Sequence, residues 1–135
     1  MFKPVATHEI PDNWGFVEPG ICKILERCNT QTFTPRDIYR HLNQGRAFLF
    51  VREEGFVVLE KCQEPLSTEP YLNVWLMWFR PGEAEKLETE LIAWLDQMRD
   101  THRCLWWEFS SPREAWGRAL DKVAKRHVTT WRRMK

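Results

Sequence analysis

The stretch from residue 71 onwards restricts the possible folds more than any other part of this chain. It opens with an apolar run over residues 71–79, which predicts a long β-strand. A turn over residues 80–84, Arg-Pro-Gly-Glu-Ala, leads into a strongly amphipathic helix, and residues 105–109 predict the next strand. A glycine turn between a strand and a helix N-terminus is a natural seat for a phosphate-bearing ligand, because the first helical amides lack partners.

The rest of this C-terminal half predicts one more helix and one more strand. Ser111 and Glu114 form a capping box at the start of a helix that is expected to reach about Arg126. A polar strand over residues 128–132 then closes the chain. Because the 71–79 run is apolar at nearly every position, we expect this strand at the centre of a sheet and covered on both faces.

The N-terminal half predicts two helices. Its first 20 residues contain three prolines and are expected to be irregular apart from a short strand at the start. A helix is expected over residues 21–28, where the apolar side chains share one face. The next helix is better marked, with Thr34 as N-cap, Asp37 in a capping-box position and Gly45 at its end.

A hairpin follows these helices. Two largely apolar runs, residues 47–52 and 56–61, are joined by Glu53, Glu54 and Gly55. A three-residue turn that ends in glycine favours a left-handed conformation at Gly55. The complete order is (β)-α-α-β-β-β-α-β-α-β, which predicts a mixed α/β or α+β fold with helices on both faces of a central sheet.

Length and composition predict the class of protein. With 135 residues, 43% of them hydrophobic, the chain is expected to form a single domain over residues 1–135. Four cysteines without a CxxC pair predict reduced thiols, and His102-x-Cys104 lacks the second half of a zinc site, so we expect no metal. The N-terminus lacks a signal-peptide pattern and no apolar run approaches the roughly 18 residues of a membrane span, so we expect a cytoplasmic protein.

The charge distribution is uneven. Residues 113–135 hold eight Lys or Arg against two acidic residues, a balance of +6, so the remainder carries −5 within the total of +1. This basic end predicts either an anionic partner or a solvated helix face. Nucleic-acid binding through Trp131 and its basic neighbours is one form of the first alternative. A pI near 7.7 argues against it, because nucleic-acid-binding domains are usually much more basic.

The element order resembles that of the GCN5-related N-acetyltransferase (GNAT) superfamily over essentially the whole chain. In that family a strand leads to two helices and three antiparallel strands, and a strand–helix–strand–helix–strand tail completes a mixed, mostly antiparallel sheet. The resemblance implies transfer of an acetyl group from acetyl-coenzyme A to a primary amine, on a small molecule or a protein, by direct attack. Small phage-encoded proteins share this order, so a phage origin is one hypothesis.

The family's cofactor loop lies between its fourth strand and third helix. The corresponding segment of this chain is similar to the family pattern at Arg80, Gly82 and Ala84. The resemblance implies that these three residues, with Trp78 and Phe79 before them, bind acetyl-coenzyme A. The physical basis is that backbone amides at a helix N-terminus hold the phosphates.

The same loop departs from the family pattern in three ways. The spacing from Arg to Gly is one residue short, Pro81 lacks an amide N–H, and Glu83 and Glu85 add negative charge beside the phosphate position. These departures favour a second hypothesis, in which the chain keeps the fold as a catalytically inactive scaffold or binding protein. In that case a surface of exposed tryptophans would contact a protein partner.

The resemblance also implies catalytic groups. The tyrosine that many members carry on the last helix has no counterpart here, because the two tyrosines are Tyr39 and Tyr71. Glu108, in the 105–109 strand, is the candidate general base, since apolar neighbours can raise a carboxyl pKa toward neutrality. Its alternative is a strand residue that faces outwards or pairs with a basic side chain. Glu60 and Asn73 are further polar residues on or beside strands.

Overall fold

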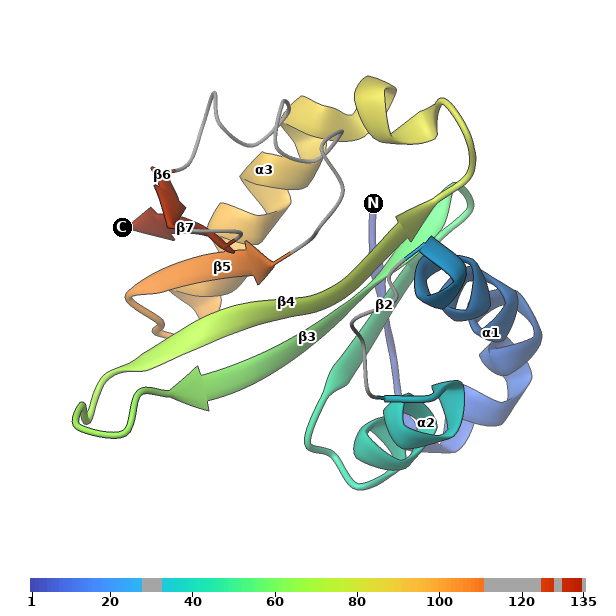
Figure 1. Ribbon diagram of the computed structural model, residues 1–135, viewed down its shortest axis with the longest axis horizontal. Coiled ribbons are helices and arrows are strands. Elements are labelled where there is room, and N and C mark those ends of the chain that lie inside the picture. Colours follow the sequence, from blue (N-terminus) through green and yellow to red (C-terminus); the bar gives the residue numbers. More distant parts are fainter. Residues whose placement is uncertain (28–32, 111–124, 128–129, 135) are drawn as a thin grey trace. The chain divides into compact units, whose positions relative to one another are not determined.

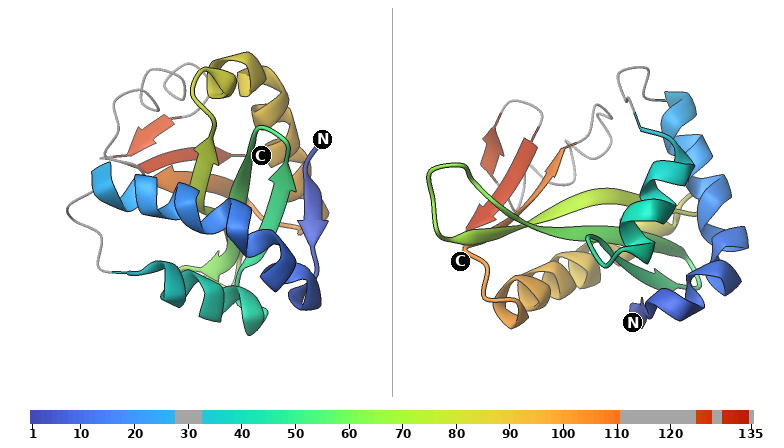
Figure 2. Two further views of the ribbon diagram at one scale, coloured as in Figure 1. Left: turned by 90° about the vertical axis from the view of Figure 1, so that its right-hand side faces the viewer. Right: turned by 90° about the horizontal axis from the view of Figure 1, so that it is seen from below.

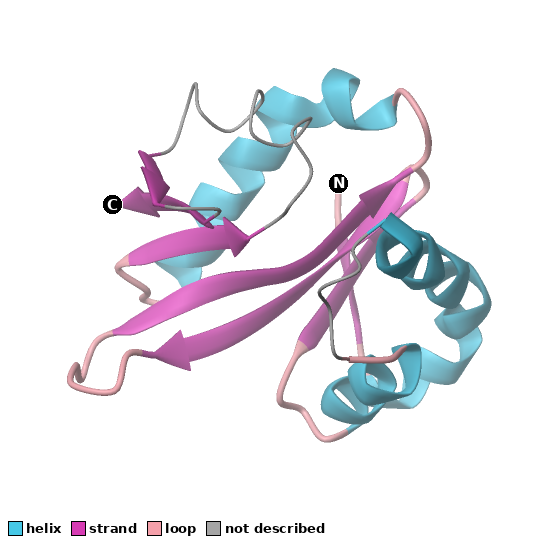
Figure 3. Cartoon of the chain, viewed as in Figure 1, coloured by secondary structure: helices cyan, strands magenta, loops and turns pink. Residues whose placement is uncertain are grey.

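The structure is a computed structural model that describes residues 1–27, 33–110, 125–127 and 130–134 (Figures 1 and 3). The strands are β1 (Lys3–Val5), β2 (Phe48–Arg52), β3 (Gly55–Gln63), β4 (Pro70–Phe79), β5 (Trp106–Ser110), β6 (Lys125–His127) and β7 (Thr130–Met134). The helices are α1 (Ile10–Arg27), α2 (Pro35–Asn43) and α3 (Glu83–Thr101), with a short 3-10 helix η1 (Thr7–Glu9). Among the residues described, no helix has the length and apolar character that crossing a membrane requires.

The seven strands of the described chain form one mixed sheet in the order β1-β2-β3-β4-β5-β7-β6. The pairs β1–β2, β2–β3, β5–β7 and β6–β7 are antiparallel, whereas β4 and β5 are parallel. This confirms the expected mixed, mostly antiparallel fold, with the 71–79 run inside the sheet between β3 and β5. A parallel pair needs a long crossover, and α3 is that crossover between β4 and β5.

Two compact units make up the chain, and β3 and β4 contribute to both. The first unit consists of Met1–Leu59 and Leu76–Arg80, and the second of Glu60–Trp75 and Pro81–Lys135. The expectation of a single domain over residues 1–135 stays a prediction.

In the first unit, α1 and α2 lie side by side, as Figure 2 shows. Trp14 of α1 meets Tyr39 of α2 edge to face, with 4.9 Å between the ring centroids. The expected cap of α2 is confirmed: the Thr34 hydroxyl accepts from the Asp37 amide at 3.3 Å, and the Asp37 carboxylate accepts from the Thr34 amide at 2.9 Å. Each terminal amide thereby gains a partner that the helix itself cannot provide.

The first helix is longer than the sequence predicts. An irregular segment is expected before residue 21, whereas α1 begins at Ile10 and runs through Pro11 and Pro19. Pro11 lies in the first turn, where its missing N–H would have no helical partner. Pro19 removes one internal hydrogen bond, but Ile10, Val17 and Ile21 are each at most 2% exposed. Burial of this apolar stripe therefore offsets the loss at Pro19.

The β2–β3 hairpin also differs from expectation. Arg52 pairs with Gly55, so Gly55 is the first residue of β3, and its φ is not among the positive values found at other glycines. The left-handed conformation expected at Gly55 is therefore wrong. Glycine is needed there because a Cβ would lie 2.1 Å from the backbone oxygen of Trp78, far inside contact distance.

In the second unit, α3 packs against β5. The apolar spacing predicts its inward stripe, and Leu91, Trp94 and Leu95 from that stripe are buried. The helix also buries Arg99, which is 7% exposed.

The C-terminal end differs from the expected pattern. The helix expected from Ser111 falls mostly on residues 111–124, which lie outside the described residues. Its expected end near Arg126 is wrong, because Lys125–His127 form β6 and pair antiparallel with β7. The closing strand is Thr130–Met134 rather than residues 128–132. Pairing with β7 gives the backbone groups of β6 sheet partners in place of helical ones.

The side chains of β4 alternate in exposure over residues 71–76. Leu72 and Val74 are 2% and 1% exposed, whereas Tyr71, Asn73 and Trp75 are half-buried. The expectation that this strand is covered on both faces therefore fails over residues 71–76, whereas Met77 and Phe79, on the same face as Asn73 and Trp75, are buried. One face of the strand thus stays partly accessible over residues 71–75 although the strand lies inside the sheet.

The described tryptophans do not form the exposed surface that a Trp-rich binding site would need. Within the described residues, Trp94, Trp106 and Trp107 are buried, and Trp14, Trp75 and Trp78 are half-buried. Trp116 and Trp131 lie among residues whose side chains are not described. The described rings therefore contribute mainly to packing.

Two glycine substitutions test this packing. Gly55→Ala should lower the free energy of unfolding by roughly 1–3 kcal/mol, because the new Cβ meets the rigid backbone of Trp78. Gly15→Ala is the matched control, since Gly15 lies in α1 with nothing within 4 Å of a Cβ. It should raise stability by about 0.5–1 kcal/mol. Urea denaturation measures both, and equal effects of the two changes would contradict the close approach at Gly55.

Candidate active site

One side of the sheet in the second unit carries polar side chains from three neighbouring strands. The register of β4 and β5 pairs Asn73 with Glu108 and Leu72 with Trp107. Because side chains alternate along a strand, each pair lies on its own side of the sheet. Trp107 hydrogen-bonds α3, so the side with Asn73 and Glu108 faces away from α3. We call it the polar face; its members are Glu60 and Cys62 of β3, Tyr71 and Asn73 of β4, and Trp106 and Glu108 of β5.

Both carboxylates of the polar face are held by neighbouring side chains. Asn73 Nδ2 donates to Glu60 Oε1 at 2.7 Å. Trp106 Nε1 donates to Glu108 Oε1 at 2.8 Å, and the Trp106 ring stacks on Tyr71 with 5.1 Å between centroids and 8° between planes. The carboxylates of Glu60 and Glu108 are therefore positioned groups on a half-buried surface.

Burial and negative charge act in the same direction on this face. Burial raises the pKa of the Cys62 thiol to about 11, with the charge of Glu60 as the next cause. Burial also raises the pKa of the Tyr71 hydroxyl to about 12, and negative charge at Cys62 and Glu108 adds to the shift. Both groups are protonated at neutral pH. Among the described side chains of this face the other acidic groups are the two carboxylates, and the register sets Arg132 of β7 opposite Glu108.

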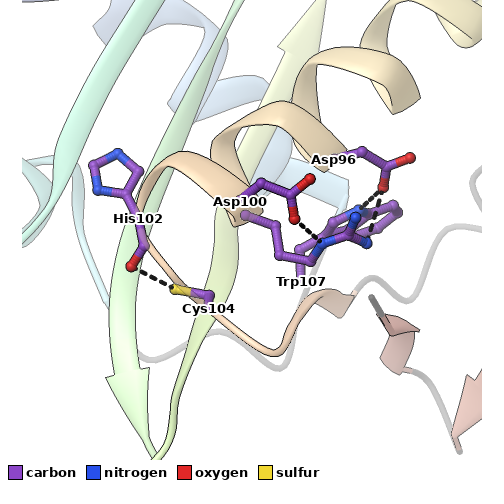
Figure 4. A network of polar contacts seen from close by, with 6 residues as sticks. Asp96, Asp100, His102, Cys104 and Trp107 are labelled. Carbon is purple, nitrogen blue, oxygen red and sulfur yellow. Dashed lines mark hydrogen bonds and ion pairs between the residues drawn. The ribbon is translucent and has the colours of Figure 1, made fainter.

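A polar network fixes the opposite side of the same strands (Figure 4). Asp96 of α3 accepts from Trp107 Nε1 at 2.9 Å and pairs with the Arg99 guanidinium at 3.3 Å. Arg99 also binds Asp100 at 3.1 Å. Arg99 is 7% exposed and Trp107 is fully buried. This network ties α3 to β5 and so positions Glu108, the residue that follows Trp107.

The side chains of Trp78 and Phe79, predicted to bind cofactor, belong to the packing of the first unit. Trp78 stacks on Phe56 with 5.9 Å between the ring centroids. Phe79 is 8% exposed and meets Phe2 edge to face at 6.1 Å. Any role of these two residues toward a cofactor therefore falls mainly to their backbone groups.

The predicted phosphate loop keeps part of its donor set. Gly82 is the N-cap of α3 with a φ of 81°, a left-handed conformation that favours glycine. The first amides of α3, including that of Ala84, have no side-chain cap. The Arg80 amide, in contrast, donates to the Glu54 carbonyl at 2.8 Å, and Pro81 has no N–H. The backbone N–H groups that this loop leaves without a side-chain partner are therefore those at the start of α3.

Known structures resemble this chain over nearly its full length. An aminoglycoside acetyltransferase from an uncultured soil metagenomic sample, in complex with sisomicin, matches with a TM-score of 0.67 at 13% identity, over 95% of this chain and 91% of that chain. A GNAT-family acetyltransferase from Listeria monocytogenes matches with a TM-score of 0.64 at 11% identity, over 100% of this chain and 93% of that chain. The chain has the GNAT fold. The NatC complex bound to Gag peptide and CoA also matches, with a TM-score of 0.59 at 10% identity, over 98% and 94% of the two chains.

Sequence comparison does not add to this result. No protein-family model matches the sequence, and no curated protein sequence matches it. The fold expected from the element order is confirmed by three-dimensional similarity alone. In the GNAT fold of this chain, Glu108 lies on the polar face beside Asn73, whereas Trp78, Phe79 and Arg80 belong to the first unit.

Within the residues that the structure describes, no group of three or more His, Cys, Asp or Glu is placed to hold a metal ion. The Cys104 thiol, from the predicted His102-x-Cys104 pair, points to the His102 carbonyl oxygen at 3.7 Å (Figure 4). Burial raises the pKa of Cys104 and keeps it a neutral thiol.

Two parts of the site are missed by sequence reasoning. The three-residue spacing of Asp96 and Arg99 could have indicated an ion pair on one face of the helix. The hydrogen bond from Trp107 to Asp96 has no such signal, because it joins β5 to α3. The Asn73–Glu60 bond likewise joins two strands. Neither partner is identifiable without the strand register.

The α3–β5 network predicts different effects of two neighbouring carboxylates. Asp96→Ala should lower the free energy of unfolding by roughly 2 kcal/mol, because it leaves the buried Trp107 Nε1 without its acceptor and Arg99 with one partner fewer. Asp100→Ala is the matched control, with a side chain 50% exposed, and should cost less than about 1 kcal/mol. Equal costs in chemical denaturation would show that the network does not fix β5.

The raised thiol pKa predicts how stability varies in alkali. The folded state keeps the Cys62 proton above the ordinary thiol pKa of 9.0, so stability should fall as the pH rises from there toward about 11. Cys62→Ala should reduce this loss, whereas Cys22→Ala, at an exposed position, should leave it unchanged. Urea denaturation at several pH values tests the difference, and parallel pH profiles for all three proteins would contradict it.

Proposed function

We propose that the chain is an N-acetyltransferase that transfers an acetyl group from acetyl-coenzyme A to a primary amine on a small molecule or a protein. The observation that carries the proposal is the pair of hydrogen-bonded carboxylates, Glu60 and Glu108, on the polar face of a GNAT fold. An aminoglycoside acetyltransferase and the CoA-bound NatC complex have the same fold, which supports an amine acceptor and a coenzyme A cofactor. A cytoplasmic location is part of the proposal.

The polar face suits a protonated amine. Glu60 and Glu108 attract an ammonium group, and the half-buried setting strengthens that attraction relative to open water. An amine must lose a proton before its nitrogen is a nucleophile. Glu108 is proposed to accept that proton, directly or through a water molecule, while the bond from Trp106 keeps its carboxylate oriented.

The cofactor would be held by the residues that the family resemblance names. Acetyl-coenzyme A would supply the activated thioester. Trp78 and Phe79 would contribute backbone groups, Arg80 its guanidinium, and Gly82 and Ala84 the open start of α3. The first-turn residue Glu83 is paired with Lys86 at 3.8 Å, which lowers the repulsion it would exert on a phosphate.

An inactive scaffold is the second candidate, and one observation favours it. Of the loop amides before Gly82, that of Arg80 is already bonded to Glu54 and Pro81 has none. A loop with fewer donors binds phosphate more weakly. Nucleic-acid binding is less favoured, because Thr130–Met134 form β7 between β5 and β6 and not a free basic tail.

Calorimetry with acetyl-coenzyme A tests the two candidates first. Micromolar binding, with desulfo-coenzyme A binding similarly and ATP binding more weakly, is expected for the acetyltransferase. If no binding is found at millimolar ligand, the inactive scaffold is the candidate that remains. A partner would then be sought by pull-down.

The catalytic role is tested on an amine that the purified protein acetylates, with thiol release as the readout. Glu108→Gln should lower kcat by about 10²-fold or more and leave coenzyme binding unchanged, because it removes only the proton acceptor. Glu53→Gln in the exposed hairpin turn is the matched control and should behave as wild type. An unchanged kcat in Glu108→Gln would remove Glu108 from the mechanism.

A further inference from the structure

Asn73 lies between the two carboxylates of the polar face. Its strand, β4, has β3 with Glu60 on one side and β5 with Glu108 on the other (Figure 1). The register sets Asn73 directly opposite Glu108. Toward β3, Asn73 Nδ2 donates to Glu60 Oε1 at 2.7 Å. All three residues belong to the second unit, so one compact unit holds the whole arrangement.

The bond to Glu60 decides which end of the Asn73 amide faces which strand. A carboxylate can only accept hydrogen bonds, so the end of the amide that meets Glu60 is the NH2 group. The carbonyl oxygen, Oδ1, then lies on the side of the amide away from Glu60. The neighbouring strand on that side is β5, which carries Glu108 opposite Asn73.

The Asn73 oxygen has no partner within the described part of the protein. The bond between Nδ2 and Oε1 is the one side-chain hydrogen bond found there for Asn73 or Glu60, and Glu60 forms no ion pair with a described residue. Both side chains are half-buried. Glu108, in contrast, accepts from the Trp106 indole and has Arg132 of β7 opposite it in the register. Asn73 Oδ1 is therefore a fixed acceptor beside Glu108 that can receive a donor from outside the described chain.

We propose that Asn73 Oδ1 accepts a hydrogen bond from the nitrogen of the acceptor amine and holds that nitrogen beside Glu108. The inference rests on the proposed function, in which Glu108 accepts a proton from the same nitrogen. A primary ammonium has three N–H groups. One proton passes to Glu108, a second N–H donates to Asn73, and the electron pair that the lost proton leaves on nitrogen is then the nucleophile. Asn73 is thus a catalytic residue that contacts the substrate, and Glu60 is a positioning residue that acts through Asn73.

The alternative is a purely structural role, in which the bond between Asn73 and Glu60 only joins β4 to β3. Such a bond contributes to stability and not to recognition of the amine. Conservative changes at Glu60 separate the two roles. Glu60→Gln keeps an oxygen that can accept from Asn73 Nδ2 and removes the charge, whereas Glu60→Ala removes the acceptor itself.

Kinetics of the full chain with acetyl-coenzyme A and n-butylamine test the inference, with thiol release as the readout. Asn73→Leu should lower kcat/KM by about tenfold or more, because the nitrogen loses a fixed acceptor. Glu60→Ala should lower kcat, whereas Glu60→Gln should keep kcat and raise only KM. Combining Glu60→Ala with Asn73→Leu should be no worse than Asn73→Leu alone, since both changes remove the same interaction.

Asn43→Leu is the matched control for the kinetics. Asn43 is exposed at the end of α2, so this change should leave kcat and KM as in wild type. Thermal melting confirms that each variant folds. If the bond only joins the two strands, Asn73→Leu will lower the melting temperature and leave kcat/KM unchanged.

An NMR titration without cofactor tests the hydrogen bond independently of turnover. The side-chain amide signals of Asn73 are assigned by their loss in Asn73→Leu. In wild type, n-butylammonium should shift these signals until the site is saturated. Butyltrimethylammonium has the same charge and no N–H group, so it should leave them unchanged.

Each result decides on the inference and the proposed function separately. If wild type acetylates n-butylamine and Asn73→Leu keeps its kcat/KM, or Glu60→Gln loses as much kcat as Glu60→Ala, the inference is wrong and the proposed function stands. If wild type binds no acetyl-coenzyme A but n-butylammonium alone shifts the Asn73 signals, the amine site stands and the proposed function fails. If neither ammonium ion shifts them, or both do so equally, the hydrogen bond to Asn73 is overturned.

Discussion

The parallel register of β4 against β5 is the constraint on which the candidate active site depends. It pairs Asn73 with Glu108 and Leu72 with Trp107, so each side of the sheet receives one kind of side chain. A shift of one residue would exchange the two sides and bury the carboxylate of Glu108 against α3. The bond from Trp107 to Asp96 opposes such a shift, because the indole N–H would lose its acceptor inside the protein.

The two sides of these strands therefore have separate tasks. The side of Leu72 and Trp107 supplies apolar burial, and the Asp96–Arg99 pair satisfies the polar groups there. The polar face holds Glu60 and Glu108 half-buried, each with a hydrogen bond from a neighbour. Complete burial of a charged carboxylate would raise the free energy of the folded protein, and complete exposure would weaken its electrostatic attraction to an ammonium group. The intermediate burial suits a site for a cationic acceptor.

Recognition of an anionic cofactor, as proposed for this chain, needs positive charge or open backbone N–H groups. The first unit carries Arg80 on the aromatic ring of Phe16, and the first amides of α3 have no side-chain cap. Under the proposed function, the first amides of α3 would hold a phosphate although Pro81 lacks an N–H.

The sequence by itself determined those elements that depend on interactions between residues close together in the chain. The cap at Thr34 and the apolar spacing of α3 predict two of the helices, and the element order predicts the GNAT fold. Tertiary structure decided the rest. Burial of the apolar stripe stabilises α1 across Pro19. The backbone of Trp78 leaves no room for a Cβ at Gly55, and strand pairing places Lys125–His127 in β6. The physical reason is the distance along the chain over which each interaction acts. Helix caps and apolar stripes involve residues a few positions apart. Strand register, the close approach at Gly55 and the hydrogen bond from Asn73 to Glu60 join residues from different elements.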